Sequence, residues 1–191
     1  MKHLRLGDEV LTKGGVYTEF LGWMDKNTEK ETQFLRIVTN NASSVTLTPS
    51  HIIYVYDEKP VTKYAQDVNI GDLLVNLSGE LEEVAAITTV QEQGYYSPLT
   101  TTGDLFVDQL LSSCYSSYPH YLAHAALYPA RTWPRLLLED EESLEENGTR
   151  GYVRIIKKLG DVLSFRRSTV DTTSWEWVEH LLAAVGLMTT N

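Results

Sequence analysis

The feature that most constrains the fold of this chain is a succession of short β-like runs between Leu4 and about Asp108. The runs are rich in β-branched, aromatic and other apolar residues, as strands are. They cover residues 10–11, 16–21, 34–38, 45–47, 52–56, 73–77, 84–90 and 105–107. Turn residues such as Gly14-Gly15 and Ser78-Gly79 separate them. Many short strands at this spacing predict an all-β fold of the sandwich or barrel type.

A turn motif occurs twice along these runs. Residues 4–11 (LRLGDEVL) and 68–75 (VNIGDLLV) each place an apolar-x-apolar triplet before Gly-Asp and a strand-like run after it, 64 residues apart. A weaker echo relates 46–49 and 53–55 to 98–100 and 105–107. Two elements repeated in the same order indicate a duplicated β subdomain with pseudo-twofold symmetry.

Charge and cysteine content exclude several classes of protein. The net charge is −10, which argues against a nucleic-acid surface, because phosphate binding needs a basic face. No apolar run approaches the roughly 20 residues that span a bilayer, and no leader segment is visible. The single cysteine, Cys114, rules out an internal disulfide and a zinc site built on paired cysteines, and we expect no metal or other cofactor. Sequons at Asn41, Asn76 and Asn147 mildly favour the secretory pathway.

The composition changes after Cys114. Residues 121–128 (YLAHAALY) could form a turn or two of helix, 139–146 (EDEESLEE) is typical of an acidic solvated linker, and 152–165 carries little signal. Residues 173–188 predict an amphipathic helix, because Thr173 and Glu176 have capping-box spacing and apolar residues follow at helical spacing. These apolar residues are Val178, Leu181, Leu182 and Val185. Trp175 and Trp177 lie at its start, and it is too short to cross a membrane.

The segment TLTPSH (46–51) places a hydroxyl, Thr48, and an imidazole, His51, on either side of Pro49 within strand-like sequence. Proline marks an edge, a bulge or a break in a strand. The imidazole could donate a hydrogen bond or a proton to an amide nitrogen while the threonine hydroxyl fixes that amide. Alternatively, the segment is an ordinary turn in which a histidine caps a strand.

Two further residues have both a catalytic and a structural interpretation. Asp25 follows the run 20–24 and could act, at the lip of a strand, as a general base on a hydroxyl, or could simply end that strand with Asn27. Cys114 could pair with His120 or His124 as a nucleophile, although a free cysteine is more often a buried apolar residue. For His124, a structural role is the more common one.

Taken together, five motifs follow one another in a characteristic order. They are TLTPSH (46–51), YSPLTxxG (96–103), SCY (113–115), LAH (122–124) and PAR (129–131). In this order the sequence resembles the autoprocessing domain of hedgehog proteins, which belongs to the Hint (hedgehog/intein) class. The resemblance implies an all-β Hint disk of two pseudo-symmetric β subdomains with a C-terminal amphipathic helical tail. It divides the chain into a Hint domain (1–131), an acidic linker and low-signal segment (132–172) and a sterol-recognition-like helix (173–191).

The resemblance also implies a self-cleaving activity of the cysteine type. In the family, a cysteine at the first position of the domain attacks the preceding carbonyl and forms a thioester, which a sterol hydroxyl, usually that of cholesterol, then attacks. Carried over by motif, Thr48 and His51 activate the scissile amide and Asp25 deprotonates the sterol. Cys114 lies near the active site without being the nucleophile.

Other positions match the family in structural or sterol-binding roles. His124 and Arg131 occupy its structural motifs. The sterol contacts are expected from the last helix, through Trp175, Trp177, Leu181 and Leu182.

The sequence departs from the family at its start. The family begins with a Gly-Cys-Phe-like junction, whereas this sequence holds no cysteine before Cys114, so we expect a fragment of a longer precursor without the nucleophile. The implied partners are the upstream signalling domain of that precursor and a sterol. We further expect a monomer, membrane association of the C-terminal helix, and passage through the endoplasmic reticulum to the outside of the cell.

Two alternatives remain at this point. The first is a non-catalytic secreted β-rich module that binds a lipid or protein through Trp175 and Trp177. The second is a free-standing cysteine hydrolase, which would require Cys114 to be exposed and to have a depressed pKa.

Overall fold

The structure is a computed structural model, and it describes residues 3–134 and 147–162. The described part contains ten strands, one 3-10 helix and three α-helices, and every strand pair is antiparallel. In chain order the elements are β1 (Glu9–Thr12), β2 (Val16–Thr39), β3 (Ser44–Leu47), β4 (His51–Asp57), β5 (Lys59–Tyr64), η1 (Ala65–Asp67), β6 (Leu73–Val75), β7 (Leu81–Thr100), β8 (Asp104–Val107), β9 (Leu110–Ser116), α1 (His120–Ala126), α2 (Tyr128–Thr132), β10 (Gly148–Thr149) and α4 (Gly151–Val162).

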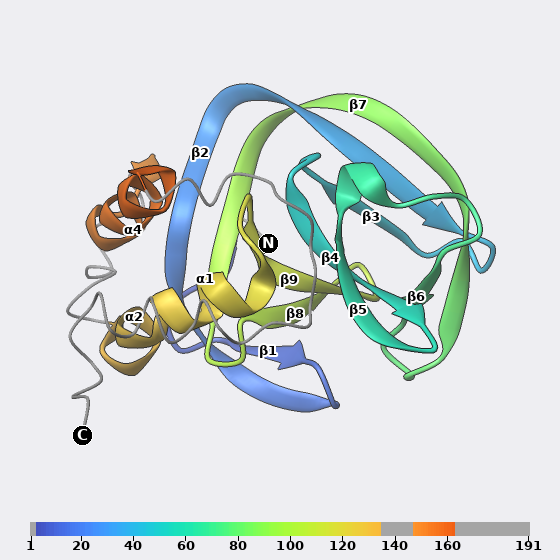
Figure 1. The fold of residues 1–191 in the computed structure, drawn as a ribbon, viewed down its shortest axis with the longest axis horizontal. Coiled ribbons are helices and arrows are strands. Elements are labelled where there is room, and N and C mark those ends of the chain that lie inside the picture. The colour runs from blue at the N-terminus through green and yellow to red at the C-terminus, as the bar shows by residue number, and fades with distance from the viewer. Residues whose placement is uncertain (1–2, 135–146, 163–191) are drawn as a thin grey trace.

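Two long strands form the frame of the molecule. β2 has 24 residues and β7 has 20, and Figure 1 shows them arching side by side over the shorter strands. They pair along almost their whole length, with register shifts that bend the ribbon. The sheet runs in the order β1-β2-β7-β6-β4-β9-β8, with β3 and β10 also paired to β2 and β5 to β4. The expected all-β fold is confirmed.

The repeated Gly-Asp motif forms the same turn in both halves. Gly7 and Gly71 have positive φ angles of 87° and 94°, which glycine adopts without steric cost. Each following aspartate accepts a hydrogen bond from the backbone N–H three residues earlier, at 2.8 Å for Asp8 and 2.9 Å for Asp72. In both copies the aspartate C=O accepts from the N–H twelve residues later at 2.8 Å. The two hairpins β1-β2 and β6-β7 therefore start alike, which confirms the duplication.

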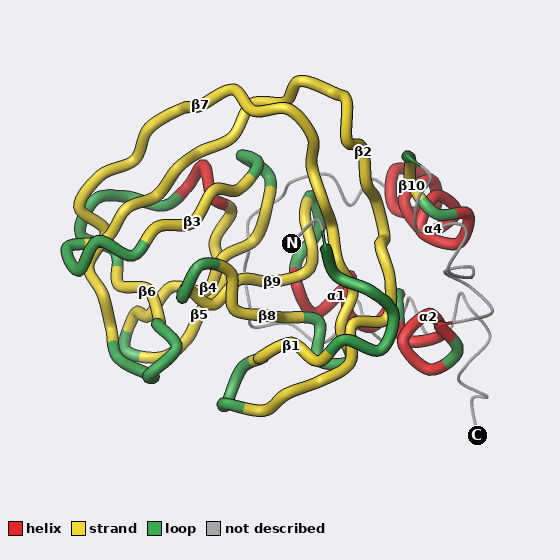
Figure 2. Tube along the Cα trace, turned by 180° about the vertical axis from the view of Figure 1, so that it is seen from behind, coloured by secondary structure: helices red, strands yellow, loops and turns green. Residues whose placement is uncertain are grey.

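The weaker echo also corresponds to related turns. The Thr48 C=O accepts from the His51 N–H at 2.9 Å, and the Thr100 C=O accepts from the Gly103 N–H at 3.3 Å. One turn leads from β3 into β4 and the other from β7 into β8. Figure 2 shows the two halves from behind.

Two apolar clusters lie on either side of the central strands. β4 is buried from Ile52 to Val55, and β9 from Leu110 to Tyr115, so both strands contribute to both clusters. Ile52 and Cys114 belong to the cluster that also packs against α2 and α4, whereas Ile53 and Leu110 belong to the other. Met24, Leu105 and Leu127 of the first cluster also line the cavity of the candidate site.

The structure differs from the expected strands at several points. β7 extends beyond the expected run 84–90 at both ends. The runs 16–21 and 34–38 are parts of the single strand β2. β9 was not expected, because its serines resemble a loop, although Ser112 and Ser113 are fully buried in it. β5 was missed as well, because it begins at Lys59-Pro60. Proline is tolerated there since β5, among the described strands, pairs with β4 alone and lies at an edge.

The segment 132–172, expected as a linker with little signal, contains regular structure where it is described. β10 pairs with β2, and α4 lies beside β2 in Figure 1 with Val153 buried in the first cluster. The helix expected at 121–128 corresponds to α1 and the start of α2. The acidic run 139–146 and the helix 173–188 lie outside the described residues, so the three-part division stays a prediction. No helix in the described ranges is long and apolar enough to cross a membrane.

Candidate functional site

The three residues expected to carry catalysis line one cavity of about 810 Å³. Asp25 comes from β2, Thr48 from the β3-β4 turn and His51 from the first position of β4. Ser97 of β7 and residues of α1, α2 and α4 complete the wall. Positions 25, 48 and 51 all come from the first copy of the repeat, and β7 of the second copy and the three α-helices complete the space that they share.

His51 lies at the point where the proline interrupts the strand. A proline in strand-like sequence marks an edge, a bulge or a break. Here it marks a break, because Pro49 lies in the turn between β3 and β4. The register between β4 and β9 shifts between His51 and Ile53. The His51 Nε2 lies 2.8 Å from the Ser113 carbonyl oxygen. This contact fixes the ring at the edge of the cavity.

The contact to Ser113 also determines which nitrogen of His51 carries the proton. A carbonyl oxygen only accepts, so Nε2 is the donor and Nδ1 keeps its lone pair when the ring is neutral. Burial lowers the pKa of His51 below its usual value, and the hydrogen bond to Ser113 opposes this only in part. A neutral imidazole with Nδ1 as acceptor is therefore the form expected at neutral pH.

Asp25 lies inside β2 rather than at its end, which corrects the expectation of a strand terminus. It sits next to a register shift, where Trp23 pairs with Pro98 and Asp25 with Ser97. The shift leaves the carboxylate at the cavity wall, with its side chain 16% exposed. Asn27 was expected to help end the strand. Its Oδ1 instead accepts hydrogen bonds from the backbone N–H groups of Glu29 and Lys30 within β2.

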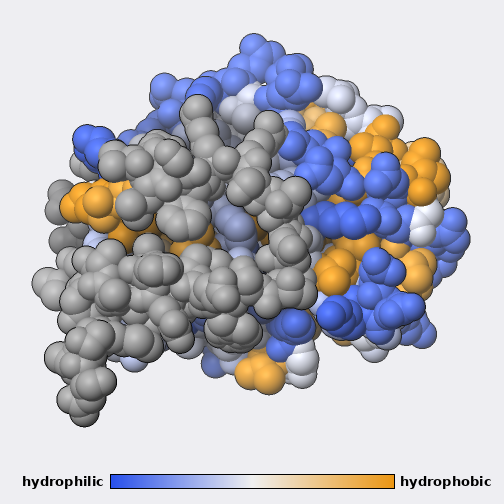
Figure 3. Space-filling view, viewed as in Figure 1, coloured by the Kyte–Doolittle hydropathy of each residue, from blue (hydrophilic) through white to orange (hydrophobic). Residues whose placement is uncertain are grey.

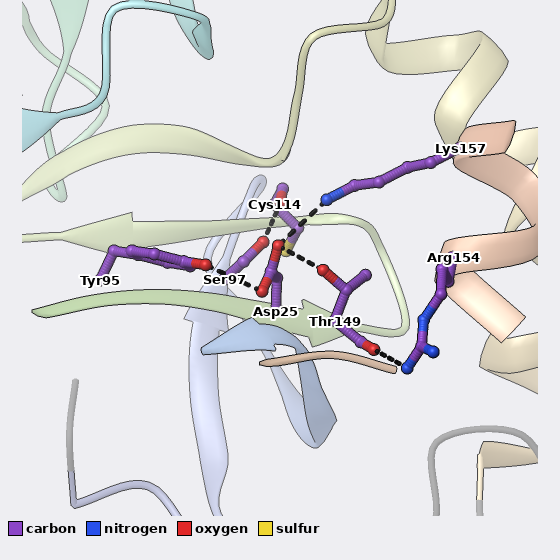
Figure 4. A network of polar contacts seen from close by, with 7 residues as sticks. All are labelled: Asp25, Tyr95, Ser97, Cys114, Thr149, Arg154 and Lys157. Atoms are coloured by element: carbon purple, nitrogen blue, oxygen red, sulfur yellow. Dashed lines mark hydrogen bonds and ion pairs between the residues drawn. The ribbon is translucent and has the colours of Figure 1, made fainter. Parts of the chain in front are cut away.

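Within the described part of the chain, three donors surround the Asp25 carboxylate (Figure 4). The Tyr95 hydroxyl donates to Oδ1 at 3.2 Å, whereas Thr149 Oγ1 and Lys157 Nζ donate to Oδ2 at 2.9 and 3.0 Å. Burial, with the nearby Asp25 carboxylate, raises the pKa of Tyr95, so its hydroxyl keeps its proton as a donor. An ionised carboxylate, which only accepts, suits all three contacts.

Thr149 and Lys157 were not found by sequence reasoning. They lie 124 and 132 residues beyond Asp25, in a segment expected to carry little signal. A signal was present, because Tyr152, Ile156 and Leu159 have the i, i+4, i+7 spacing of one helix face, and all three line the cavity.

Cys114 is buried in the first apolar cluster with no solvent exposure. Its Sγ lies 3.5 Å from Thr100 Oγ1, and burial raises the pKa of the thiol to about 12. A hydrolase nucleophile needs an exposed thiol with a depressed pKa. The interpretation of this chain as a hydrolase that uses Cys114 is therefore wrong. Its backbone remains close to the site, since its carbonyl accepts from Ser97 Oγ at 3.4 Å.

The remaining motifs meet in one polar network, of which Tyr115 and Arg131 also line the cavity. His124 Nδ1 lies 2.8 Å from the Tyr115 hydroxyl, and Arg131 donates to the His124 and Thr101 carbonyls, each at 2.9 Å. The His120 ring stacks on that of His124, with 5.7 Å between the ring centroids. The His120 Nδ1 lies 2.9 Å from the hydroxyl of Ser113, whose carbonyl accepts from His51. This geometry fits a structural role for His124 and Arg131.

Gly103 of this network should not tolerate a side chain. A Cβ there would lie 2.5 Å from both His124 Nδ1 and the Tyr115 hydroxyl, at a φ of +76°. We expect Gly103→Ala to lower the free energy of unfolding by about 3 kcal/mol, from overpacking and backbone strain together. Gly79→Ala is the matched control, because its φ is +79° with no atom within 4 Å, and it should cost only about 1 kcal/mol, from the backbone strain alone. Urea unfolding of both variants measures the difference, and equal losses would contradict the clash.

The two stacked histidines should make stability depend on pH. Burial, chiefly, lowers the pKa of both His120 and His124 to about 4, whereas an unfolded histidine titrates near 6.5. The unfolded chain therefore binds more protons between these values, and stability is full above about pH 6.5 and is lost as the pH falls toward 4. Each histidine adds a slope of up to about 1.4 kcal/mol per pH unit.

Urea unfolding between pH 7 and pH 5 tests this dependence. His124→Gln should reduce the slope of the free energy of unfolding against pH by about the contribution of one histidine. The same change at the exposed His3 should leave this slope unaltered. A slope that His124→Gln does not change would contradict the assignment.

Further observations concern the expected sterol contacts, metal binding and the surface of α4. The expected sterol contacts Trp175, Trp177, Leu181 and Leu182 lie outside the described residues. Within residues 3–134 and 147–162, no group of three or more His, Cys, Asp or Glu side chains could hold a metal ion. Ile155 and Leu159 of α4 are exposed, and Figure 3 shows apolar side chains at that edge of the molecule.

Comparisons with known proteins agree on the family. The family model of the Hint module matches residues 1–165 of the chain. Warthog protein 1 of Caenorhabditis elegans is 31% identical over 158 residues, covering 78% of this chain and 33% of that protein. Tiggy-winkle hedgehog protein of Danio rerio is 29% identical over 189 residues, covering 88% of this chain and 45% of that protein. The chain thus spans less than half the length of these curated relatives.

A solved structure supports the same fold. The crystal structure of the gp41-1 intein superposes with a TM-score of 0.50 at 15% identity, covering 58% of this chain and 83% of the intein. At this identity the likeness concerns the fold alone.

Proposed function

The chain belongs to the Hint module family, and from this premise we propose that it is the autoprocessing domain of a hedgehog-like precursor, which releases an upstream segment by transferring it to a sterol. The observation that carries the proposal is the cavity that Asp25, Thr48 and His51 line together. Both steps act on one acyl carbon, so the groups that serve them must reach a common space.

In the first step, a cysteine thiol attacks the carbonyl carbon before it. The C–S bond forms, the C–N bond breaks, and the amide nitrogen leaves as an amine after taking up a proton. His51 is suited to this transfer because its neutral Nδ1 can take the thiol proton and pass it to the nitrogen. Thr48, three residues earlier in the same turn, would hold the amide by a hydrogen bond.

In the second step, a sterol hydroxyl attacks the thioester carbon. Asp25 accepts the hydroxyl proton as the new C–O bond forms, the C–S bond breaks, and the thiolate is protonated as it leaves. The ionised carboxylate that fits the three donors around Asp25 is the form that a base requires. Splitting one acyl transfer into two is the general logic of covalent catalysis.

The nucleophile of this proposal is a cysteine outside the given sequence. Cys114 cannot serve, because its thiol is fully buried and its pKa is raised to about 12. Its place beneath the site instead suits an influence on the environment of the attacking thiol.

The cavity supports an apolar acceptor. Its volume of about 810 Å³ lies within the usual range for small-molecule sites. Apolar side chains from three regions line it, among them Phe34 of β2, Leu122 and Leu127 near α1, and Val153 and Ile156 of α4. A largely apolar molecule with one hydroxyl would suit such a wall.

A secretory location, cleavage of an upstream signalling segment, a monomeric state and membrane association of the last helix belong to the same proposal. Of the three sequons, Asn76 is unsuited to glycosylation, because its side chain is buried and its amide donates to Glu82 at 2.8 Å. Asn41 and Asn147 are exposed.

The experiment that tests the proposal fuses a reporter and a first strand containing Cys-Phe to the full chain. Release of the reporter is followed on gels with dithiothreitol alone and with cholesterol in detergent. We expect dithiothreitol to release the reporter by attacking the thioester, and cholesterol to accelerate release. A folded fusion that releases nothing under either condition would contradict the proposal and favour the non-catalytic binding module.

A further inference from the structure

The two oxygens of the Asp25 carboxylate are engaged unequally. Oδ2 accepts two hydrogen bonds, from Thr149 Oγ1 at 2.9 Å and from Lys157 Nζ at 3.0 Å. From the described residues, Oδ1 accepts one longer bond, from the Tyr95 hydroxyl at 3.2 Å. Figure 4 shows Thr149 and Lys157 approaching the carboxylate from one side and Tyr95 from the other. Oδ1 is therefore the oxygen with more capacity to accept a further hydrogen bond.

Both donors to Oδ2 belong to the segment 147–162. Thr149 is the β10 residue that pairs directly with Asp25, and Lys157 lies about two turns along α4. The segment comes from a part of the chain that follows both β subdomains. A carboxylate of one subdomain is thus oriented by an element added after the duplicated fold.

The docking of this segment does not depend on the Lys157 side chain. The Arg150 N–H donates to the Met24 carbonyl at 3.0 Å, and the Tyr152 hydroxyl donates to the Ala126 carbonyl at 3.0 Å. Val153 is buried in the first apolar cluster. The Lys157 side chain itself is 43% exposed. Its ammonium group can therefore be removed while α4 stays in place.

We propose that Thr149 and Lys157 are positioning residues for the acceptor step: they hold Asp25 Oδ2 so that Oδ1 receives the proton of the incoming hydroxyl. This inference rests on the proposed function and deepens it. It makes the second step depend on the Thr149 and Lys157 side chains, whereas the first step, served by His51 and its contact to Ser113, does not use them. The bonds that form and break are those of the second step described above.

The physical reason is the freedom of a carboxylate about its last torsion. Such torsions are broad, and only partners fix them. Without the two donors to Oδ2, the group can turn toward Tyr95 or solvent and lose its alignment with the hydroxyl. Small misplacements of a reacting group cost up to about 10²-fold in rate.

The test measures two rates on the reporter fusion of the full chain: release by dithiothreitol and release by cholesterol in detergent. Lys157→Met and Thr149→Val should each lower the cholesterol-dependent rate about tenfold or more, and leave the dithiothreitol rate within about twofold. Lys157→Arg, which keeps the cation and its donors, should restore most of the cholesterol-dependent rate.

A variant on the same helix is the matched control. Lys158→Met makes the same change of charge at the next, exposed residue. It should keep the parent rates. Amide hydrogen exchange over 148–157 should show unchanged protection in Lys157→Met.

Each outcome decides between the proposals. A parent cholesterol rate in Lys157→Met, or an equal loss in Lys158→Met, overturns the positioning role. If dithiothreitol does not release the reporter from the parent, the proposed function fails, and this inference with it. If dithiothreitol acts but cholesterol does not, only the sterol assignment fails. Release by water, whose proton needs the same base, then provides the comparison, and Lys157→Met must still slow it about tenfold.

Discussion

His51→Ala is expected to lower the rate of reporter release by dithiothreitol by about 10²- to 10⁴-fold, the range that a positioned proton-transfer group supplies. The reason is that the thioester forms only slowly without a group that moves the thiol proton to the departing nitrogen. His51 is held for this by its 2.8 Å bond to the Ser113 carbonyl, which leaves Nδ1 as the acceptor. The rate of release on gels measures the effect.

The pH dependence of the same reaction provides a second readout. Because burial lowers the pKa of His51, the neutral ring persists below pH 6.5, and the acid limb of the release rate should lie below that value. His3→Ala, at an exposed histidine, is the control and should change neither rate nor profile. Undiminished release in a folded His51→Ala variant would contradict the assignment of the first step.

Asp25→Asn should separate the two steps. The amide keeps the size of the carboxylate but cannot take a proton, so acceleration by cholesterol should fall by about 10²-fold or more. Release by dithiothreitol should remain close to that of the parent, because an added thiol attacks as the thiolate and needs no base from Asp25. The ratio of the two rates, measured in one preparation, is the quantity to compare.

The matched control changes a carboxylate elsewhere. Asp57→Asn alters an exposed residue at the end of β4, and both rates should stay at the parent value. Equal loss of both activities in Asp25→Asn would mean that Asp25 supports the structure of the site, and retained cholesterol acceleration would mean that another group is the base.

The sequence predicted those parts of the fold that local pattern determines. The Gly-Asp repeat indicated the duplication because glycine at positive φ and an aspartate that closes its own turn are both local requirements. Thr48 and His51 could be recognised together because one turn holds them. β9 was not predicted, because Ser112 and Ser113 are buried polar residues and a hydrophobic pattern does not reveal such residues.

The partners of Asp25 could not be predicted for a different reason. A register shift in β2 places the carboxylate, and Thr149 and Lys157 reach it from more than 120 residues away. Neither a strand pattern nor a helix pattern specifies which residues meet across such a separation. The weak helical spacing in 152–159 would have placed α4, but not its contact with the site.

The most direct test of the central claim is the mass of the reporter released in the presence of cholesterol, determined on its C-terminal peptide. The account predicts a peptide heavier by one sterol less one water, and a peptide carrying dithiothreitol when the thiol is used instead. A released peptide that ends in an unmodified carboxylate, with cholesterol present and release fast, would contradict acyl transfer to a sterol and would identify hydrolysis as the reaction.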